Sequence, residues 1–185
     1  MRHRGKWWSV PVFTAFATLA FAQPFADHAA EINGETLHFS IRAFPAGASL
    51  TDPAAPLEPV SALDTAKLLN RHLTAGNIEE AALLSTSPRR KFEVLRDYKD
   101  SVGDEGFREV FTEYFVPENR LVAEVSMDGH SLLVWHLRTA NRYAGQFYVQ
   151  IAGKVYLDDM PSPTRSALRR VLDAIRAGKV ALPIP

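Results

Sequence analysis

The amino-acid sequence predicts an α+β domain in which N-terminal helices pack on a curved antiparallel four-stranded meander, with one further helix at the C-terminus. Three observations support this class. Apolar residues recur every three or four positions between residues 61 and 115, which is typical of amphipathic helices. Apolar and polar residues alternate in short runs over residues 121–158, which is typical of antiparallel strands. A last amphipathic stretch covers residues 162–178.

The helical part divides into four segments because of its capping and turn-forming residues. A serine or asparagine before an apolar run can cap a helix, and a glycine or proline after the run can end it. Serine followed by proline is a particularly common helix start. The residues that mark these starts, breaks and ends are Ser61, Gly76, Asn77, Ser87, Gly103-Asp104 and Pro117.

Four short strands are expected after the helices, at residues 121–127, 131–138, 146–151 and 155–158. Asp128-Gly129 is typical of a two-residue hairpin turn, and Asn141 and Gly153 mark two further turns. Strands that are joined by tight turns usually pair with their neighbours in sequence, which gives a meander. The C-terminal helix should begin at Ser162, which is again followed by proline.

The first 22 residues have the layout of a secretory signal peptide. A basic start is followed by an apolar run, and small residues precede an expected cleavage site between Ala22 and Gln23. The run is shorter than the roughly 20 residues of a membrane span, so no span is expected after cleavage. The absence of cysteine excludes a lipoprotein. We therefore expect a Sec-type signal and a periplasmic or secreted protein.

The remaining chain divides into three parts. Residues 23–60 are expected to hold an N-terminal strand, at about 37–42, and a proline-rich linker. Residues 61–178 form the single α+β domain, and residues 179–185 form a short tail.

Composition excludes several classes of function. The chain has 21 basic and 21 acidic residues, and this balance argues against a dedicated nucleic-acid binder. Without cysteine it can have no disulfide, thiolate nucleophile or cysteine–zinc site. Glycine-rich phosphate loops and the common hydrolase motifs are absent, and the histidines lack the spacing of metal ligands. The sequence therefore predicts no cofactor and no metal site.

Alternation along the strands predicts two sheet faces of different character. One face is apolar and needs a cover of helices or a partner chain; it is expected to hold Leu133, Trp135, Leu137, Phe147, Val149 and Ile151. The other face collects the polar residues, among them the candidate site residues Glu124, His136, Tyr148 and Asp158.

The polar face has three interpretations. It is a solvated outer surface with ordinary cross-strand pairs. It is a protein-contact surface, for which tyrosine, histidine and arginine are suited. Or it lines a cavity in which His136 is a base and Tyr148 or Asp158 orients a substrate, with Glu124 as a further candidate.

Two clusters of basic residues stand out. Arg89-Arg90-Lys91 occupies the first turn of an expected helix, where positive charge is mildly unfavourable. The second cluster lies on the C-terminal helix and consists of Arg165, Arg169, Arg170 and Arg176. Both are interpreted as solvated helix faces, with contact to anionic lipid head groups or cell-wall polymers as the functional alternative.

Two stretches carry a family resemblance. Residues 68–85 read LLNRHLTAGNIEEAALLS, and residues 148–159 read YVQIAGKVYLDD. They resemble the opening helices and the final hairpin of the nuclear-transport-factor-two-like superfamily, the cystatin-like α+β cone, and especially its exported bacterial members. The resemblance spans about residues 62–159. It implies a curved sheet wrapped around helices and a conical pocket, which in that family holds a ligand, catalyses or is filled by side chains.

These observations together predict an exported, non-catalytic module of the cell envelope. It would bind a small apolar or amphipathic ligand, or a protein, either a second copy of itself or an envelope protein. One alternative is a small-molecule enzyme with isomerase- or cyclase-like acid–base chemistry at His136. Another is an accessory or neutralising partner of an envelope protein.

Overall fold

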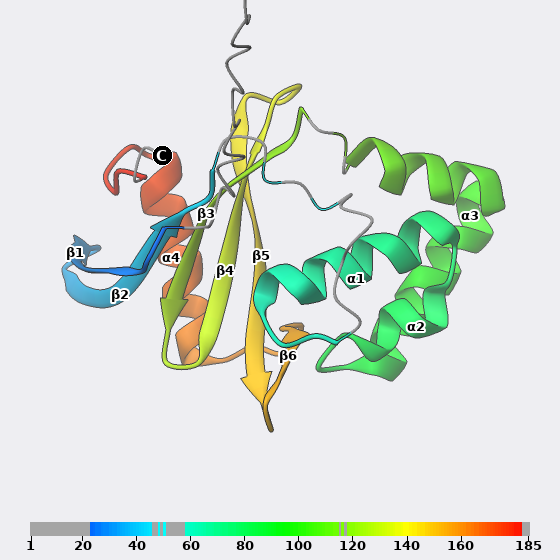
Figure 1. Cartoon of the computed structure of the whole chain (residues 1–185), viewed down its shortest axis with the longest axis horizontal. Helices are drawn as coiled ribbons and strands as arrows, with labels where there is room; N and C mark the ends of the chain where they lie inside the picture. Colours follow the sequence, from blue (N-terminus) through cyan, green and yellow to red (C-terminus); the bar gives the residue numbers. More distant parts are fainter. Residues whose placement is uncertain are drawn as a thin grey trace, which may run out of the picture.

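The computed structural model describes residues 23–45, 48, 50, 58–114, 116 and 118–182. Within these residues, six antiparallel strands form one sheet in sequence order and four helices pack on it (Figure 1). The strands are β1 (Ala26–Ile32), β2 (Glu35–Ala43), β3 (Arg120–Met127), β4 (His130–Leu137), β5 (Arg142–Ile151) and β6 (Lys154–Leu157). The helices are α1 (Ala62–Ala75), α2 (Ile78–Leu83), α3 (Pro88–Tyr114) and α4 (Pro163–Arg176).

The predicted α+β class is confirmed, but the four-stranded meander is wrong. The sheet begins with a hairpin of β1 and β2, whose turn is Asn33-Gly34 with both residues at positive φ. β2 then pairs with β3, so α1, α2 and α3 lie between two neighbouring strands of the sheet and are not N-terminal to it. The signal peptide expected at residues 1–22 and most of the expected linker lie outside the described residues.

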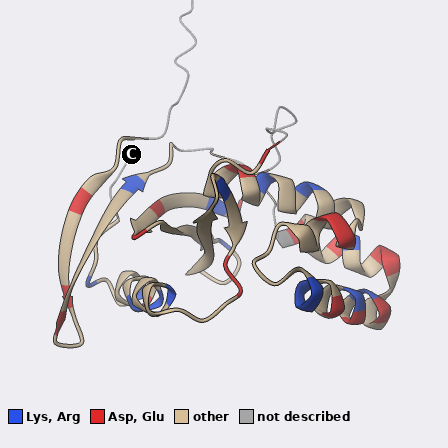
Figure 2. Ribbon diagram, turned by 90° about the horizontal axis from the view of Figure 1, so that it is seen from below, with Lys and Arg blue, Asp and Glu red and all other residues tan. Residues whose placement is uncertain are grey.

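Helices cover both faces of the sheet, which corrects the expectation of helices on one face only. α1, α2 and α3 pack on one face, and α4 packs on the opposite face (Figures 1 and 2). The physical reason is visible in β4, where the four consecutive residues from Leu132 to Trp135 are all buried. A strand that is covered on both faces needs a continuous apolar run rather than an alternating one.

The register between β4 and β5 also corrects the predicted composition of the two faces. Ser131 lies opposite Tyr148 and Leu133 lies opposite Gln146, so these side chains share the face covered by α1. Phe147 lies opposite Leu132 and belongs to the α4 face. The predicted grouping of Phe147 with Leu133 on one face is therefore wrong. Because side chains alternate with a period of two, an error of one residue in register exchanges the faces of a whole strand.

Gly145 in β5 lies where side chains of β4 and α4 fill the space beside the strand. A Cβ atom at this position would lie 2.6 Å from Leu132 Cδ1 and 2.7 Å from Leu172 Cδ2. The space that a side chain would fill on β5 is thus occupied by leucines from β4 and from α4.

The starts of α1 and α4 and the break in α3 agree with the capping and turn residues of the sequence. Asn77 precedes α2 as predicted, but its side chain makes no capping hydrogen bond, and the predicted helix end at Pro117 lies outside the described residues. The Ser61 hydroxyl accepts a hydrogen bond from the Asp64 N–H (3.1 Å), and Gly76 ends α1 in the left-handed conformation. α3 is interrupted at Gly103, whose φ of 77° and ψ of 166° are not helical, as the predicted break requires. The Ser162 hydroxyl accepts from the Arg165 N–H (3.0 Å) at the start of α4.

Ser162→Ala should lower the free energy of unfolding by about 1 kcal/mol, because it removes this N-cap acceptor. Equilibrium unfolding in urea measures the change. Ser166→Ala is the matched control, since the exposed Ser166 hydroxyl donates to the Ser162 backbone carbonyl and accepts from no N–H at the start of the helix. Equal effects of the two substitutions would contradict the assignment of Ser162 as the cap.

Candidate functional site

A cleft of about 220 Å³ lies between the start of α1 and the adjoining part of the sheet. Thr65 fixes α1 in this position, because its buried hydroxyl donates to the Val155 carbonyl of β6 (2.7 Å). The residues that line the cleft come from the N-terminal segment, from the start of α1 and from five strands, β2 to β6. They include Phe25, Arg42, Ser61, Glu124, Ser126, Ser131, Tyr148 and Gln150.

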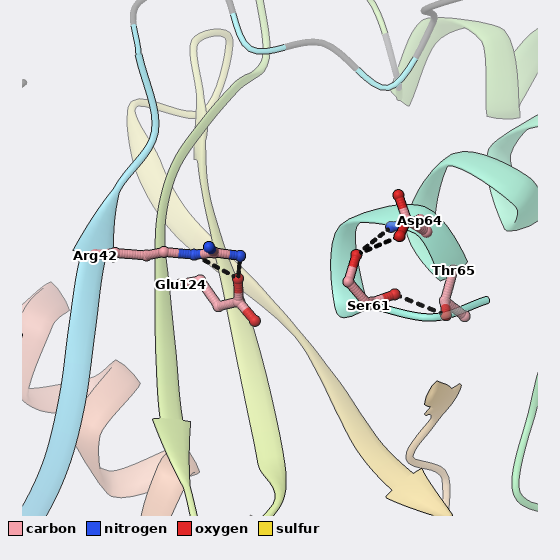
Figure 3. Close-up of polar contacts among 5 residues, drawn as sticks. All are labelled: Arg42, Ser61, Asp64, Thr65 and Glu124. Carbon is pink, nitrogen blue, oxygen red and sulfur yellow. Dashed lines mark hydrogen bonds and ion pairs between the residues drawn. The ribbon is translucent and has the colours of Figure 1, made fainter. Parts of the chain in front are cut away.

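An ion pair between β2 and β3 forms the polar centre of the cleft (Figure 3). Arg42 and Glu124 are directly opposite each other in the strand register. The Arg42 Nε and one terminal nitrogen both donate to Glu124 Oε2, with the Nε bond at 3.0 Å. The Glu124 side chain is 5% exposed and the Arg42 side chain 24% exposed. The pair is therefore largely withdrawn from water but remains open to the cleft.

Two aromatic rings hold the Arg42 guanidinium from its sides. Its central carbon lies 4.5 Å from the centre of the Phe25 ring and 5.5 Å from that of Phe44. Cation–π attraction at these distances adds to the ion pair with Glu124. The guanidinium therefore contacts both a carboxylate and two aromatic rings.

Tyr148 lies in the wall of the same cleft and is fully buried. Its hydroxyl donates to Gln146 Oε1 at 2.9 Å. Two of the four candidate residues from the sequence, Glu124 and Tyr148, therefore line one site.

The structure places His136 and Asp158 elsewhere. His136 is partly exposed, with Nε2 at 3.3 Å from Asn141 Oδ1 and its ring 5.5 Å from that of Tyr143. Asp158 is buried after β6, where its Oδ1 accepts from the Met160 N–H (3.2 Å) and its Oδ2 lies 3.9 Å from His130 Nε2. The combination of His136 with Tyr148 or Asp158 is not assembled in this arrangement.

Sequence reasoning missed Arg42, Phe25 and Ser61 as residues of the site. Arg42 stands at the end of the strand that alternation predicted at residues 37–42, but the pattern gave no indication of its partner. Glu124 is 82 positions away in the chain. The sequence did contain one signal for this pair, since each of two predicted strands holds a residue of opposite charge, Arg42 in one and Glu124 in the other.

The cleft is suited to hydrogen bonding. It offers one cation, one anion, the serine hydroxyls and the Gln150 amide. Glu124 Oε2 already accepts two hydrogen bonds from Arg42, so this oxygen takes part in holding the pair rather than in proton transfer. Among the described residues, no group of three histidines, aspartates or glutamates is placed to hold a metal ion.

Comparison with known proteins gave no match: no family model, no curated protein and no solved structure matches this chain. The likeness to the nuclear-transport-factor-two-like superfamily therefore stays a prediction. In the part of the chain that the structure describes, every helix is too short or too polar to cross a membrane.

Proposed function

We propose that the protein is an exported, non-catalytic module that binds a small polar molecule in the cleft around Arg42 and Glu124. One observation carries this proposal: a largely buried ion pair lines a concave site. Removing two charges from water is costly, and well-packed apolar residues would give equal or greater stability. Stability alone therefore does not account for the pair, whereas ligand recognition does.

The geometry favours a zwitterion of about the size of an amino acid. The bonds to Glu124 use Nε and one terminal nitrogen of Arg42, which leaves the other terminal nitrogen to donate to a ligand carboxylate. Glu124 offers negative charge to a ligand ammonium group. The volume of about 220 Å³ is below the roughly 300 Å³ at which drug-sized pockets begin. A polar ligand fits this lining better than the apolar or amphipathic ligand expected from the sequence.

The serines of the cleft provide the test. Ser126 and Ser131 line it from β3 and β4, face each other in the strand register, and are only partly buried. Replacing both by alanine should leave the fold intact and weaken ligand binding about thirtyfold, because two neutral hydrogen bonds at roughly 1 kcal/mol each contribute about 2 kcal/mol. Ser101→Ala, on the exposed side of α3, is the matched control.

The measurement is thermal unfolding of the chain that begins at Gln23, with a panel of free amino acids and their decarboxylated and deaminated analogues. A zwitterion that binds should raise the unfolding temperature of the wild type and of Ser101→Ala, but only weakly that of the double variant. Failure of the whole panel to stabilise the wild type, or equal stabilisation of the double variant, would overturn the proposal. Export is tested separately: a secreted mass that begins at Met1 would contradict cleavage after Ala22.

A further inference from the structure

A second and larger pocket, of about 410 Å³, lies between the starts of α3 and α4. Its charged lining consists of Arg90 and Lys91 from α3, Arg165 from α4 and Asp159 from the segment between β6 and α4. Figure 2 shows basic residues in blue on both helices. None of these residues belongs to the cleft around Arg42 and Glu124. The volume is within the range of ligand pockets, roughly 300–1,000 Å³.

Two of the three cations in this pocket have no counter-charge. Lys91 Nζ is 3.0 Å from Asp159 Oδ2, and the same oxygen accepts a hydrogen bond from the Ser85 hydroxyl (2.8 Å). Asp159 is thereby committed to Lys91 and Ser85. Arg90 and Arg165 form no ion pair with any other described residue. The pocket consequently has an excess of positive charge.

Arg165 is positioned by packing rather than by an acidic partner. Its guanidinium lies over the Phe147 ring, 5.3 Å from the ring centre. Its Nε is buried and has no hydrogen-bond partner in the structure. A buried donor without an acceptor is destabilising, so the protein alone leaves the hydrogen-bonding capacity of this side chain unfilled.

The basic residues of this pocket lie in the first turns of α3 and α4, where positive charge destabilises a helix. Neither α3 nor α4 has an acidic residue in its first turn, and both have basic residues there instead. The start of a helix carries partial positive charge, so a cation there is unfavourable and an anion is favourable. Both helices that begin at this pocket therefore lack the acidic first-turn residues that would stabilise them. A bound anion would reverse the sign of this interaction at each.

We propose that this pocket binds a phosphate monoester. Arginine donates paired hydrogen bonds to phosphate oxygens, and here Arg90 and Arg165 come from separate helices, with Lys91 as a third cation. The pocket is larger than a single phosphate needs, which leaves room for the group that the phosphate esterifies. That group belongs either to a soluble small molecule or to a lipid, since both present the same phosphate chemistry.

Isothermal titration with glycerol 3-phosphate tests the soluble source, and sedimentation with phosphatidylcholine vesicles, with and without phosphatidic acid, tests the lipid source. The wild type should bind at least one of these phosphate probes. Arg90→Gln and Arg165→Gln should each weaken that binding at least about tenfold, the loss expected for one hydrogen bond to a charged group.

Arg169→Gln is the matched control, because it removes the same charge one turn further along α4 from an exposed side chain outside the pocket. Its binding should stay within about twofold of the wild type. Arg165→Gln could disturb the packing on Phe147. Arg90 is exposed and its side chain forms no ion pair with another described residue, so Arg90→Gln tests phosphate binding without this complication.

Binding of glycerol 3-phosphate identifies a soluble ester, and binding to phosphatidic acid vesicles alone identifies a lipid. Absence of binding to both probes would overturn the proposal. So would an equal loss in Arg169→Gln, which would indicate a diffuse charge effect. The double substitution at Ser126 and Ser131 should leave phosphate binding unchanged, so this inference and the proposed function can fail independently.

Discussion

Glu124→Leu in a chain that retains Arg42 is expected to lower the free energy of unfolding by about 3 kcal/mol. The substitution leaves the guanidinium without its carboxylate, and removal of one partner from a buried pair typically costs about 3–5 kcal/mol. We take the lower end because the Arg42 side chain is 24% exposed and so is partly solvated. Equilibrium unfolding in urea measures the effect.

The double variant Arg42→Met, Glu124→Leu separates this charge effect from a loss of packing. Replacement of both partners by apolar residues is often neutral, so the double variant should be more stable than Glu124→Leu alone. Together with the wild type and the single variants Glu124→Leu and Arg42→Met, the double variant completes a double-mutant cycle. If the two single effects simply add, the pair is not coupled and the geometry of the cleft is not as described.

Leu168→Ala is expected to lower the free energy of unfolding by about 2–5 kcal/mol. Leu168 is completely buried between α4 and the sheet, and its truncation removes apolar contacts and leaves a cavity. Thermal and urea unfolding of the variant measure the loss. This variant tests the apolar core between α4 and the sheet, which the sequence analysis did not predict.

Arg169→Ala, at the neighbouring exposed position of α4, serves as the control and should change stability by less than about 0.5 kcal/mol. A loss of less than 1 kcal/mol in Leu168→Ala would show that α4 does not pack on this face of the sheet.

Local features of the fold could be predicted from the sequence because they depend on nearby residues. The start of α1 at Ser61 and the break at Gly103 follow from capping and backbone preferences over a few positions. β1 could not be predicted in this way, because its residues are mostly exposed and do not alternate between apolar and polar. It is a strand because β2 pairs with it.

Arg42 was missed as a site residue because its place depends on strand pairing between distant parts of the chain. Glu124 and Tyr148 could be proposed because they are polar residues within predicted strands. Arg42 joins them only when β2 pairs with β3, and nothing in the local pattern specifies that pairing. The unbroken apolar run from Leu132 to Trp135 indicates a strand that is covered on both faces. The predicted assignment of faces rested on alternation alone and so missed this.

The glycine at position 145 has a consequence for how α4 packs on the sheet. Leu172 fills the space above this glycine, so the absence of a side chain there sets how closely α4 can approach β5. Leu172 belongs to α4, the helix whose first turn holds Arg165. Any side chain at position 145 would have to displace the terminal methyl groups of Leu132 and Leu172. The fit of α4 on the sheet therefore depends on a side chain that β5 does not have.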